Sequence, residues 1–263
     1  MNTADLFRLD GRVAFISGAA GHLGREMAWA LGEAGATVIL NGRNAIRLDA
    51  FAKRLGAAGI SVECATFDMM EFETVRRFFA SRPRIDVLIN NAVTMTPKSL
   101  AMAGPEDFDQ TYRSAVTAAF EAVRAARPAL VMAARTTGGA SVINIATMYA
   151  QVSPDPKLYN EPGQMSPPHY GAAKAGLVQL TRHLAAELGP DGVRVNALSP
   201  GPFPKGEVAE RDPAFAARLA SRTMLGRTAG APEIRGPILF LASPASSFVT
   251  GTVLAADGGW TAW

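Results

Sequence analysis

The sequence predicts an α/β fold, built as a doubly wound, seven-stranded parallel sheet with helices on both faces. Three observations carry this prediction: short apolar runs rich in Val and Ile recur, helical patterns separate them, and a glycine-rich turn follows the first run. Uninterrupted apolar runs are typical of strands buried on both faces. The 263 residues, 48% of them hydrophobic, suffice for one core, so we expect residues 1–263 to form a single domain.

Seven segments have the character of strands, and most are spaced widely enough for a helix to connect them. They are RVAFISG (12–18), TVILNGR (37–43), ISVECATFD (60–68), IDVLINNA (85–92), ASVINIAT (140–147), VRVNALSPG (193–201) and TVLAAD (252–257). Helical patterns lie between them, notably at 25–35, 105–134 and 169–188. The first of these helices has a stop signal at Gly35.

The segment SGAAGHLG (17–24) joins the first predicted strand to the first long helix. Gly18 allows a sharp turn, and Gly24 allows the helix to pack closely on the strand. The N–H groups at the start of that helix attract a pyrophosphate. Placement after a strand and before a helix favours a nucleotide-binding loop over a purely structural turn.

The end of the second predicted strand, NGRN (41–44), bears on the type of nucleotide. A carboxylate here would accept hydrogen bonds from the ribose hydroxyls of NAD, but the chain has Asn41 and Arg43. Arg43 can bind a 2′-phosphate through two parallel hydrogen bonds, whereas a carboxylate would repel it. We therefore expect NADP(H) to be favoured, with NAD(H) as the alternative. If Arg43 is instead an ordinary solvated arginine, the sequence gives no reason for this preference.

Tyr170 and Lys174 are four residues apart in PPHYGAAKAGL (167–177), so a helix would place both on one face. An ammonium group near a phenol favours the phenolate and lowers the phenol pKa from its usual value of about 10. Such a tyrosine can exchange a proton with a carbinol oxygen while hydride moves at a nicotinamide. Chance also produces this spacing, so the interpretation of Tyr170 as general acid/base depends on the neighbouring motifs.

A proline-rich segment, QVSPDPKLYNEPGQMSPP (151–168), breaks the alternation of strands and helices. Its five prolines in 18 residues exclude a helix or a central strand. It follows the fifth predicted strand, at the edge where open α/β sheets bind ligands. We expect this insertion and the loop 202–222 to form a substrate lid; a surface decoration is the alternative.

Together these motifs resemble those of the short-chain dehydrogenases/reductases over nearly the whole chain. SGAAGHLG is similar to the family's Thr-Gly-x-x-x-Gly-x-Gly loop, FDM (67–69) to its adenine-contacting Asp, NNAV (90–93) to Asn-Asn-Ala-Gly, and YGAAK to Tyr-x-x-x-Lys; RVNALSPGP and FVTGTVLAADGG also match. The resemblance implies a Rossmann fold and an NAD(P)(H)-dependent oxidoreductase that interconverts a secondary alcohol and a ketone. It implies Tyr170, Lys174 and Thr147 as catalytic residues, with Thr147 where the family has serine.

The resemblance is to members of the gluconate 5-dehydrogenase type, which implies a sugar, a sugar acid or another polar carbonyl compound as substrate. A 3-oxoacyl-thioester reductase and a non-catalytic nucleotide-binding protein are the alternatives. The expected cofactor-binding residues are Ser17, Gly18, Ala20, Gly21, His22, Leu23, Gly24, Asn41, Arg43, Asp68, Met69, Asn91, Ala92, Val93, Tyr170, Lys174, Pro200, Gly201 and Phe203. The expected substrate-facing residues are Met148, Tyr149, Tyr159, His169 and Phe203, with a packing role as the alternative for His169.

Three positions depart from the family pattern in ways that bear on the site. His22 stands where the second motif glycine is usual, and Val93 replaces the last glycine of Asn-Asn-Ala-Gly. Ala115 stands where the family has an asparagine that supports a helix irregularity and a relay water. Ser114 or Thr117 is a candidate substitute; a backbone carbonyl could also hold the water, or the relay could be slower.

Composition and charge exclude several classes of function. The net charge is +3 with scattered basic residues, which argues against a nucleic-acid surface. No apolar run approaches the roughly 18 residues of a membrane span, and the N-terminal segment has no signal-peptide pattern. Cys64 is the single cysteine, and the histidines have no metal-like spacing. We expect a cytoplasmic protein that acts on a small molecule, without a metal, as a homotetramer or homodimer like the family it resembles.

Overall fold

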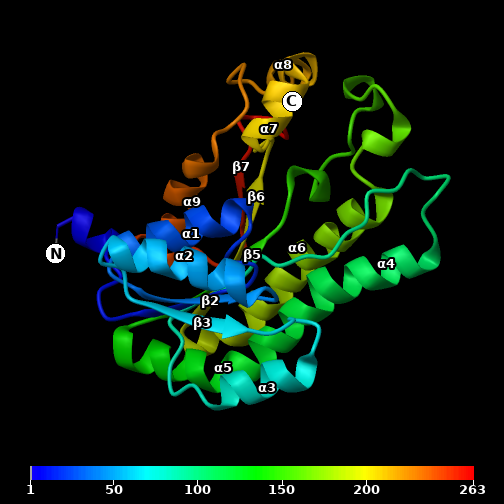
Figure 1. The fold of residues 1–263 in the computed structure, drawn as a ribbon. Coiled ribbons are helices and arrows are strands. Elements are labelled where there is room, and N and C mark those ends of the chain that lie inside the picture. Colours follow the sequence, from blue (N-terminus) through cyan, green and yellow to red (C-terminus); the bar gives the residue numbers. More distant parts are fainter. Residues whose placement is uncertain (1) are drawn as a thin grey trace.

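The computed structural model describes residues 2–263 and contains a seven-stranded parallel sheet (Figure 1). The strands are β1 (Val13–Ile16), β2 (Thr37–Gly42), β3 (Val62–Thr66), β4 (Val87–Asn90), β5 (Ala140–Ile145), β6 (Val193–Pro200) and β7 (Val253–Ala256). Their order is β3-β2-β1-β4-β5-β6-β7, and β1 pairs with β2 on one side and with β4 on the other. The strand order therefore runs outward from β1 in both directions. This change in strand order opens a crevice at the carboxyl ends of β1 and β4, where such sheets bind ligands. The predicted fold class is confirmed.

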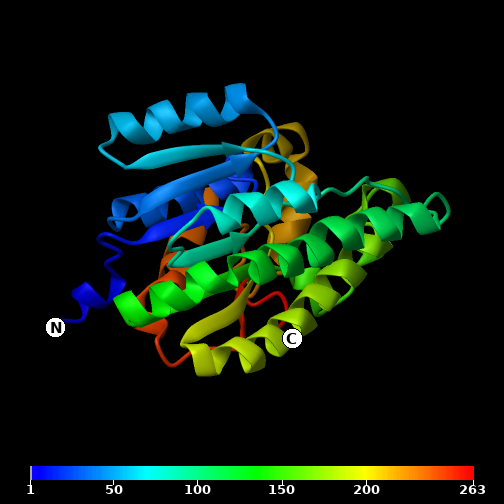
Figure 2. The ribbon, with the colours of Figure 1, turned by 90° about the horizontal axis from the view of Figure 1, so that it is seen from below.

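Helices cover both faces of the sheet. One face carries α1 (His22–Glu33), α2 (Ala45–Ala57) and α9 (Arg235–Ala242). The other carries α3 (Phe72–Ala80), α5 (Ala118–Thr137) and α6 (Pro168–Leu188), which lie across the sheet in the view from below (Figure 2). Consecutive residues of β1 serve opposite cores, because Ala14 and Ile16 face α1 whereas Phe15 packs on Phe79 of α3. No helix within residues 2–263 is long and apolar enough to cross a membrane.

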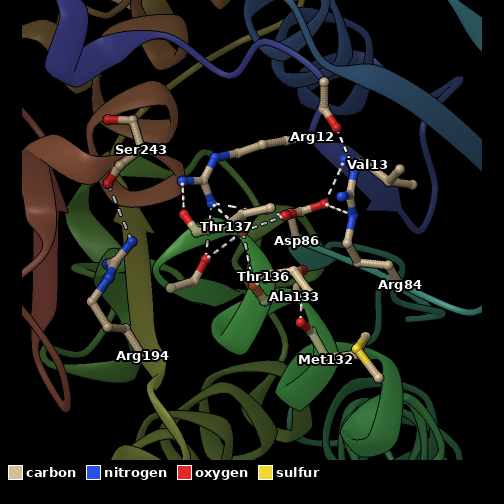
Figure 3. A network of polar contacts seen from close by, with 12 residues as sticks. Arg12, Val13, Arg84, Asp86, Met132, Ala133, Thr136, Thr137, Arg194 and Ser243 are labelled. Atoms are coloured by element: carbon tan, nitrogen blue, oxygen red, sulfur yellow. Dashed lines mark hydrogen bonds and ion pairs between the residues drawn. The ribbon is translucent and has the colours of Figure 1, made fainter.

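A buried carboxylate ties the amino-terminal ends of β1 and β4 together (Figure 3). Asp86 is fully buried and accepts hydrogen bonds from the Val13 backbone N–H at 2.9 Å and the Thr137 hydroxyl at 2.8 Å. The guanidinium groups of Arg84, at 3.0 Å, and Arg12, at 3.8 Å, balance its charge. This network stabilises the end of the sheet that lies opposite the crevice. It is therefore structural, and a ligand site is expected among the loops at the carboxyl ends of the strands.

The two segments expected to form a lid pack against each other. The insertion contains short 3₁₀ turns at Pro156–Leu158 and Pro162–Gln164, and the loop 202–222 contains α7 (Gly206–Arg211) and α8 (Pro213–Ser221). The Arg218 side chain of α8 donates a hydrogen bond from Nε to the Leu158 carbonyl oxygen at 2.7 Å. Leu158 is buried with Met148, Leu219 and Trp260. The insertion is therefore joined to α8 and to the C-terminal segment by an apolar cluster.

Candidate active site

Thr147, Tyr170 and Lys174 lie together at the carboxyl edge of the sheet. They line one cavity of about 240 Å³. Thr147 follows β5, whereas Tyr170 and Lys174 lie one turn apart on α6. The remaining walls come from the start of α1, the end of β4 and the segment after β6, through Gly21, His22, Leu23, Gly24, Asn91, Val93, Ile145, Ala146, Pro200, Gly201 and Phe203.

Lys174 is buried, and its ammonium group has a backbone partner. Nζ donates a hydrogen bond to the carbonyl oxygen of Ile145 at 2.5 Å and lies 5.9 Å from the centroid of the Tyr170 ring. Burial disfavours the charged form and lowers the pKa of Lys174 to about 8. The lysine is thus held at the end of β5, beside the tyrosine.

Burial raises the pKa of Tyr170, and a hydrogen bond with the Thr147 hydroxyl partly opposes the shift. The expectation that Lys174 lowers this pKa is wrong for this structure. The Nζ of Lys174 donates to the Ile145 carbonyl oxygen, and the loss of solvation is the main cause of the raised pKa of Tyr170. Tyr170 therefore keeps its proton at neutral pH, which makes it a proton donor.

The glycine-rich loop forms a close turn between β1 and α1. Gly18 has φ of +64°, and a side chain there would meet the Asn91 amide at 2.9 Å. A side chain at Gly24 would meet the Gly18 carbonyl oxygen at 2.3 Å. Ser17 is buried, and its hydroxyl accepts hydrogen bonds from the backbone N–H groups of Asn91 and Ala92. It thus holds the β4 loop against the glycine-rich loop rather than lining the cavity.

A second hollow of about 390 Å³ continues from this loop along the ends of β2, β3 and β4. Gly21, Asn91 and Val93 line both hollows, so the two form one groove. Predicted cofactor residues Gly18, Ala20, Gly21, Asn41, Arg43, Asp68, Met69, Asn91, Ala92 and Val93 line the second hollow. The N-cap residue of α1, Gly21, has no side chain with which to cap the free N–H groups at the start of this helix. A groove with exposed N–H groups at a helix start fits a dinucleotide.

Charge in the second hollow comes mainly from two arginines. The Arg43 side chain is 66% exposed and lies 3.5 Å from the Asp68 carboxylate. Arg47, one turn further on, also lines the hollow and was not predicted. Asn41 is buried, and its Nδ2 donates to the Ala65 and Phe67 carbonyl oxygens, so this amide joins β2 to the end of β3. The spacing of four between Arg43 and Arg47, at the start of a helix, was the available signal for Arg47.

Of the five predicted substrate-facing residues, Phe203 lines the cavity that contains Tyr170. Met148 is buried in the cluster beneath the insertion. His169 is also buried: its Nδ1 lies 2.9 Å from the Thr111 hydroxyl, and its ring packs edge-on against Phe108. The first turn of α6 directs this residue toward α4 (Pro105–Tyr112), so the packing alternative describes His169.

Tyr149 and Tyr159 contact each other, and neither lines the cavity that contains Tyr170. Their hydroxyl oxygens are 2.7 Å apart. Tyr149 packs edge-on against Trp260, and Tyr159 packs against Phe215 of α8. These tyrosines therefore fix the insertion to α8.

The long helix predicted at 105–134 is interrupted by a π-helical segment, Arg113–Thr117, between α4 and α5. Ala115 lies in this segment, so the irregularity is present without the family asparagine. The Ser114 hydroxyl accepts a hydrogen bond from the Thr94 N–H and donates to backbone carbonyl oxygens, including that of Thr94. Ser114, a candidate from the sequence, therefore fastens the loop after β4 to the helix and lines the groove together with Thr94, which was not predicted.

No group of three or more His, Cys, Asp or Glu side chains within residues 2–263 is arranged to hold a metal ion. The side chains of the candidate active site offer proton transfer by Tyr170, hydrogen bonding by Thr147 and a nearby positive charge on Lys174.

Comparisons with known proteins agree with this geometry. The family model described as enoyl-(acyl carrier protein) reductase matches residues 18–261. A gluconate 5-dehydrogenase from Gluconobacter oxydans is 34% identical over 268 residues, covering 99% of each protein. A 3-oxoacyl-(acyl-carrier-protein) reductase from Thermotoga maritima is 32% identical, covering 96% of this chain and 98% of that protein.

Among solved structures, a gluconate 5-dehydrogenase from Burkholderia cenocepacia in complex with NADP and tartrate has a TM-score of 0.86. It is 32% identical, and each chain is covered in full. The match of the family model and of these relatives over nearly the whole length shows that the chain belongs to the short-chain dehydrogenases/reductases.

Proposed function

We propose that the protein is an NADP(H)-preferring oxidoreductase that interconverts a polar secondary alcohol and the corresponding ketone by hydride transfer. The observation that carries this proposal is that Thr147, Tyr170 and Lys174 line a cavity continuous with the groove at the start of α1. A proton donor thus lies at one end of a groove that fits a dinucleotide.

The groove residues have distinct parts in holding the cofactor. The N–H groups at the start of α1 would bind the pyrophosphate, because they are uncapped and lie at the positive end of the helix dipole. Arg43 and Arg47 would bind a 2′-phosphate, since both line the hollow at the end of β2. When bound, the nicotinamide supplies or accepts the hydride.

Tyr170 moves the proton. In ketone reduction its phenol donates the proton to the substrate oxygen as hydride reaches the carbonyl carbon, which yields the alcohol and a tyrosinate. Burial, which raises the pKa of Tyr170, keeps this proton in place at neutral pH. Oxidation of the alcohol needs the tyrosinate instead, so its rate rises with pH.

Thr147 and Lys174 support this transfer. The Thr147 hydroxyl forms a hydrogen bond with Tyr170, and its oxygen also accepts a weak hydrogen bond from the Tyr149 N–H at 3.4 Å. The substrate oxygen would bind beside these two hydroxyl groups and exchange this bond for its own. The Lys174 ammonium group stabilises the negative charge that forms on Tyr170. The positive charge matters most after the proton has left.

The relatives guide the choice of substrate. The similarity to the gluconate 5-dehydrogenase of Gluconobacter oxydans supports a sugar acid as the substrate of this protein. The similarity to the 3-oxoacyl-(acyl-carrier-protein) reductase of Thermotoga maritima supports a 3-oxoacyl thioester as the second candidate. The insertion 151–168 and the loop 202–222 act as the lid in this proposal.

The chain would work as a single domain and as a homo-oligomer in the cytoplasm. Exposed apolar side chains at Phe248 and Trp263 support association between copies. The proposal is tested by incubating the protein with NADPH or NADP⁺ and a panel of sugars, sugar acids, cyclic ketones and 3-oxoacyl thioesters while following the absorbance of the reduced nicotinamide. Turnover of a sugar acid at the highest kcat/KM supports the proposal, turnover of thioesters alone supports the second candidate, and no cofactor binding at all contradicts both.

A further inference from the structure

We propose that His22 is a positioning residue that braces the segment after β6 against the start of α1, between two walls of the cofactor groove. His22 is the first residue of α1, and its Nε2 lies 3.1 Å from the carbonyl oxygen of Phe203, 181 positions further along the chain. A carbonyl oxygen only accepts hydrogen bonds, so Nε2 carries the hydrogen. The role of the brace in cofactor binding rests on the proposed function.

The brace crosses between two walls of the same cavity. His22 and Phe203 both line the cavity that contains Tyr170 and Lys174. Gly21, which precedes His22, has no side chain to cap the helix, so the N–H groups at this helix end are open beside the imidazole ring. The ring therefore sets the spacing between the anion-attracting end of α1 and the segment Pro200–Phe203.

The segment after β6 has few other hydrogen bonds, and the Phe203 side chain packs on the core. Gly201 donates its N–H to the Ala256 carbonyl oxygen, and the Pro202 carbonyl oxygen accepts from Ala229. The Phe203 carbonyl oxygen has a single hydrogen-bond donor among residues 2–263, and this donor is His22. Pro204 follows and has no N–H to donate. Loss of His22 would thus leave Phe203 held by the packing of its side chain on the core, without a hydrogen bond to its carbonyl oxygen.

A pre-formed wall lowers the cost of ordering this segment when a ligand binds. Most members of the resembled family have glycine at this motif position and so lack the imidazole. A single hydrogen bond of this kind corresponds to roughly a two- to tenfold change in the dissociation constant. Since the brace lies outside the reacting groups, its effect is expected on cofactor affinity and on the mobility of the segment.

Limited trypsin digestion without cofactor tests the brace itself. Lys205 is exposed and follows Phe203 by two positions, so the cleavage rate after Lys205 reports on this segment. Lys157 in the insertion is also exposed and serves as an internal reference on the same molecule. We expect His22→Ala to speed cleavage after Lys205 several-fold with no change at Lys157. His22→Gln, whose amide can donate to the same carbonyl oxygen, should restore the slow rate.

The dissociation constant for NADPH, from the fluorescence of the binary complex, tests the consequence. We expect it to rise two- to tenfold in His22→Ala, to recover in His22→Gln and to stay unchanged in the control His183→Ala, since His183 is exposed on α6. His22→Gly, with the family residue, serves if His22→Ala does not fold. Unchanged cleavage after Lys205, or unchanged or tighter NADPH binding, in the variant that lacks the imidazole would overturn the proposal. Failure of the wild type to bind NADPH or NADH would instead refute the proposed function, while the digestion still decides whether the brace exists.

Discussion

The ammonium group of Lys174 donates a hydrogen bond to the carbonyl oxygen of Ile145, the last residue of β5, at 2.5 Å. The lysine is therefore held by the backbone of the sheet rather than by a carboxylate. A buried ammonium group without a carboxylate partner loses its proton more readily, in agreement with the pKa of about 8. The catalytic position thus costs the folded protein stability at neutral pH.

Lys174→Met should show this cost as a dependence on pH. The pKa of Lys174 is lowered from the ordinary 10.5 to about 8 on folding, so between these values the unfolded chain binds more protons than the folded chain. The free energy of unfolding of the wild type therefore rises with pH across this interval, and the methionine variant lacks that rise. Urea unfolding at several pH values should find the stability of the variant, relative to wild type, highest below pH 8 and falling toward pH 10.5. Lys53→Met, at an exposed position of α2, should show no such trend; a flat difference for Lys174→Met would contradict the burial argument.

Arg43→Ala should weaken NADPH binding by about tenfold or more and leave NADH binding nearly unchanged, because a charged hydrogen bond to a 2′-phosphate is lost. Fluorescence titration of both nucleotides measures the effect. Arg54→Ala, at an exposed position near the end of α2, the helix that begins just after Arg43, is the matched control. Equal losses for the two nucleotides would remove the basis for an NADP(H) preference.

Ser114→Ala should lower the free energy of unfolding by about 1–3 kcal/mol, because it leaves the N–H of Thr94 without its partner. Urea unfolding gives the value. Ser81→Ala removes a hydroxyl from an exposed helix end and should cost much less. If the two variants lose the same stability, Ser114 does not fasten the loop after β4.

Arg218→Met should loosen the insertion, since it removes the 2.7 Å hydrogen bond to Leu158. The expected results are faster tryptic cleavage after Lys157 and a higher KM for the substrate. Arg222→Met, just beyond the end of α8, keeps the Leu158 bond and should behave as the wild type. An unchanged KM together with faster cleavage would separate the insertion from the substrate site.

Much of the fold followed from local sequence signals. Each of the seven predicted strands is present, because apolar runs ended by glycine or polar residues mark buried parallel strands well. The break in the helix at Arg113–Thr117 was not visible as a helix boundary, since the residues on both sides favour helix. The 3₁₀ turns within the insertion were also not predictable from the sequence, because they depend on contacts with α8 rather than on hydrophobic periodicity.

The site was predictable where a motif fixes the chain path and less so where tertiary packing decides. The glycine-rich loop and the pair Tyr170 and Lys174 lie together as the spacing predicts. The direction of the Tyr170 pKa shift was predicted wrongly, because the sequence does not reveal that burial is the main influence on this phenol. His169 was expected to face the substrate or to pack, and packing decides in favour of the second role, because successive helical residues point about 100° apart.

The central claim is that Tyr170 transfers the proton, and Tyr170→Phe tests it most directly. The substitution removes one hydroxyl group and keeps the ring, so the cofactor groove is preserved. Stopped-flow measurement with the best substrate of the panel should find the hydride-transfer rate lowered by roughly 10²- to 10⁴-fold, with the dissociation constant for NADPH unchanged. Tyr112→Phe, on the exposed side of α4, should match the wild type. A Tyr170→Phe variant with the wild-type rate would contradict the account.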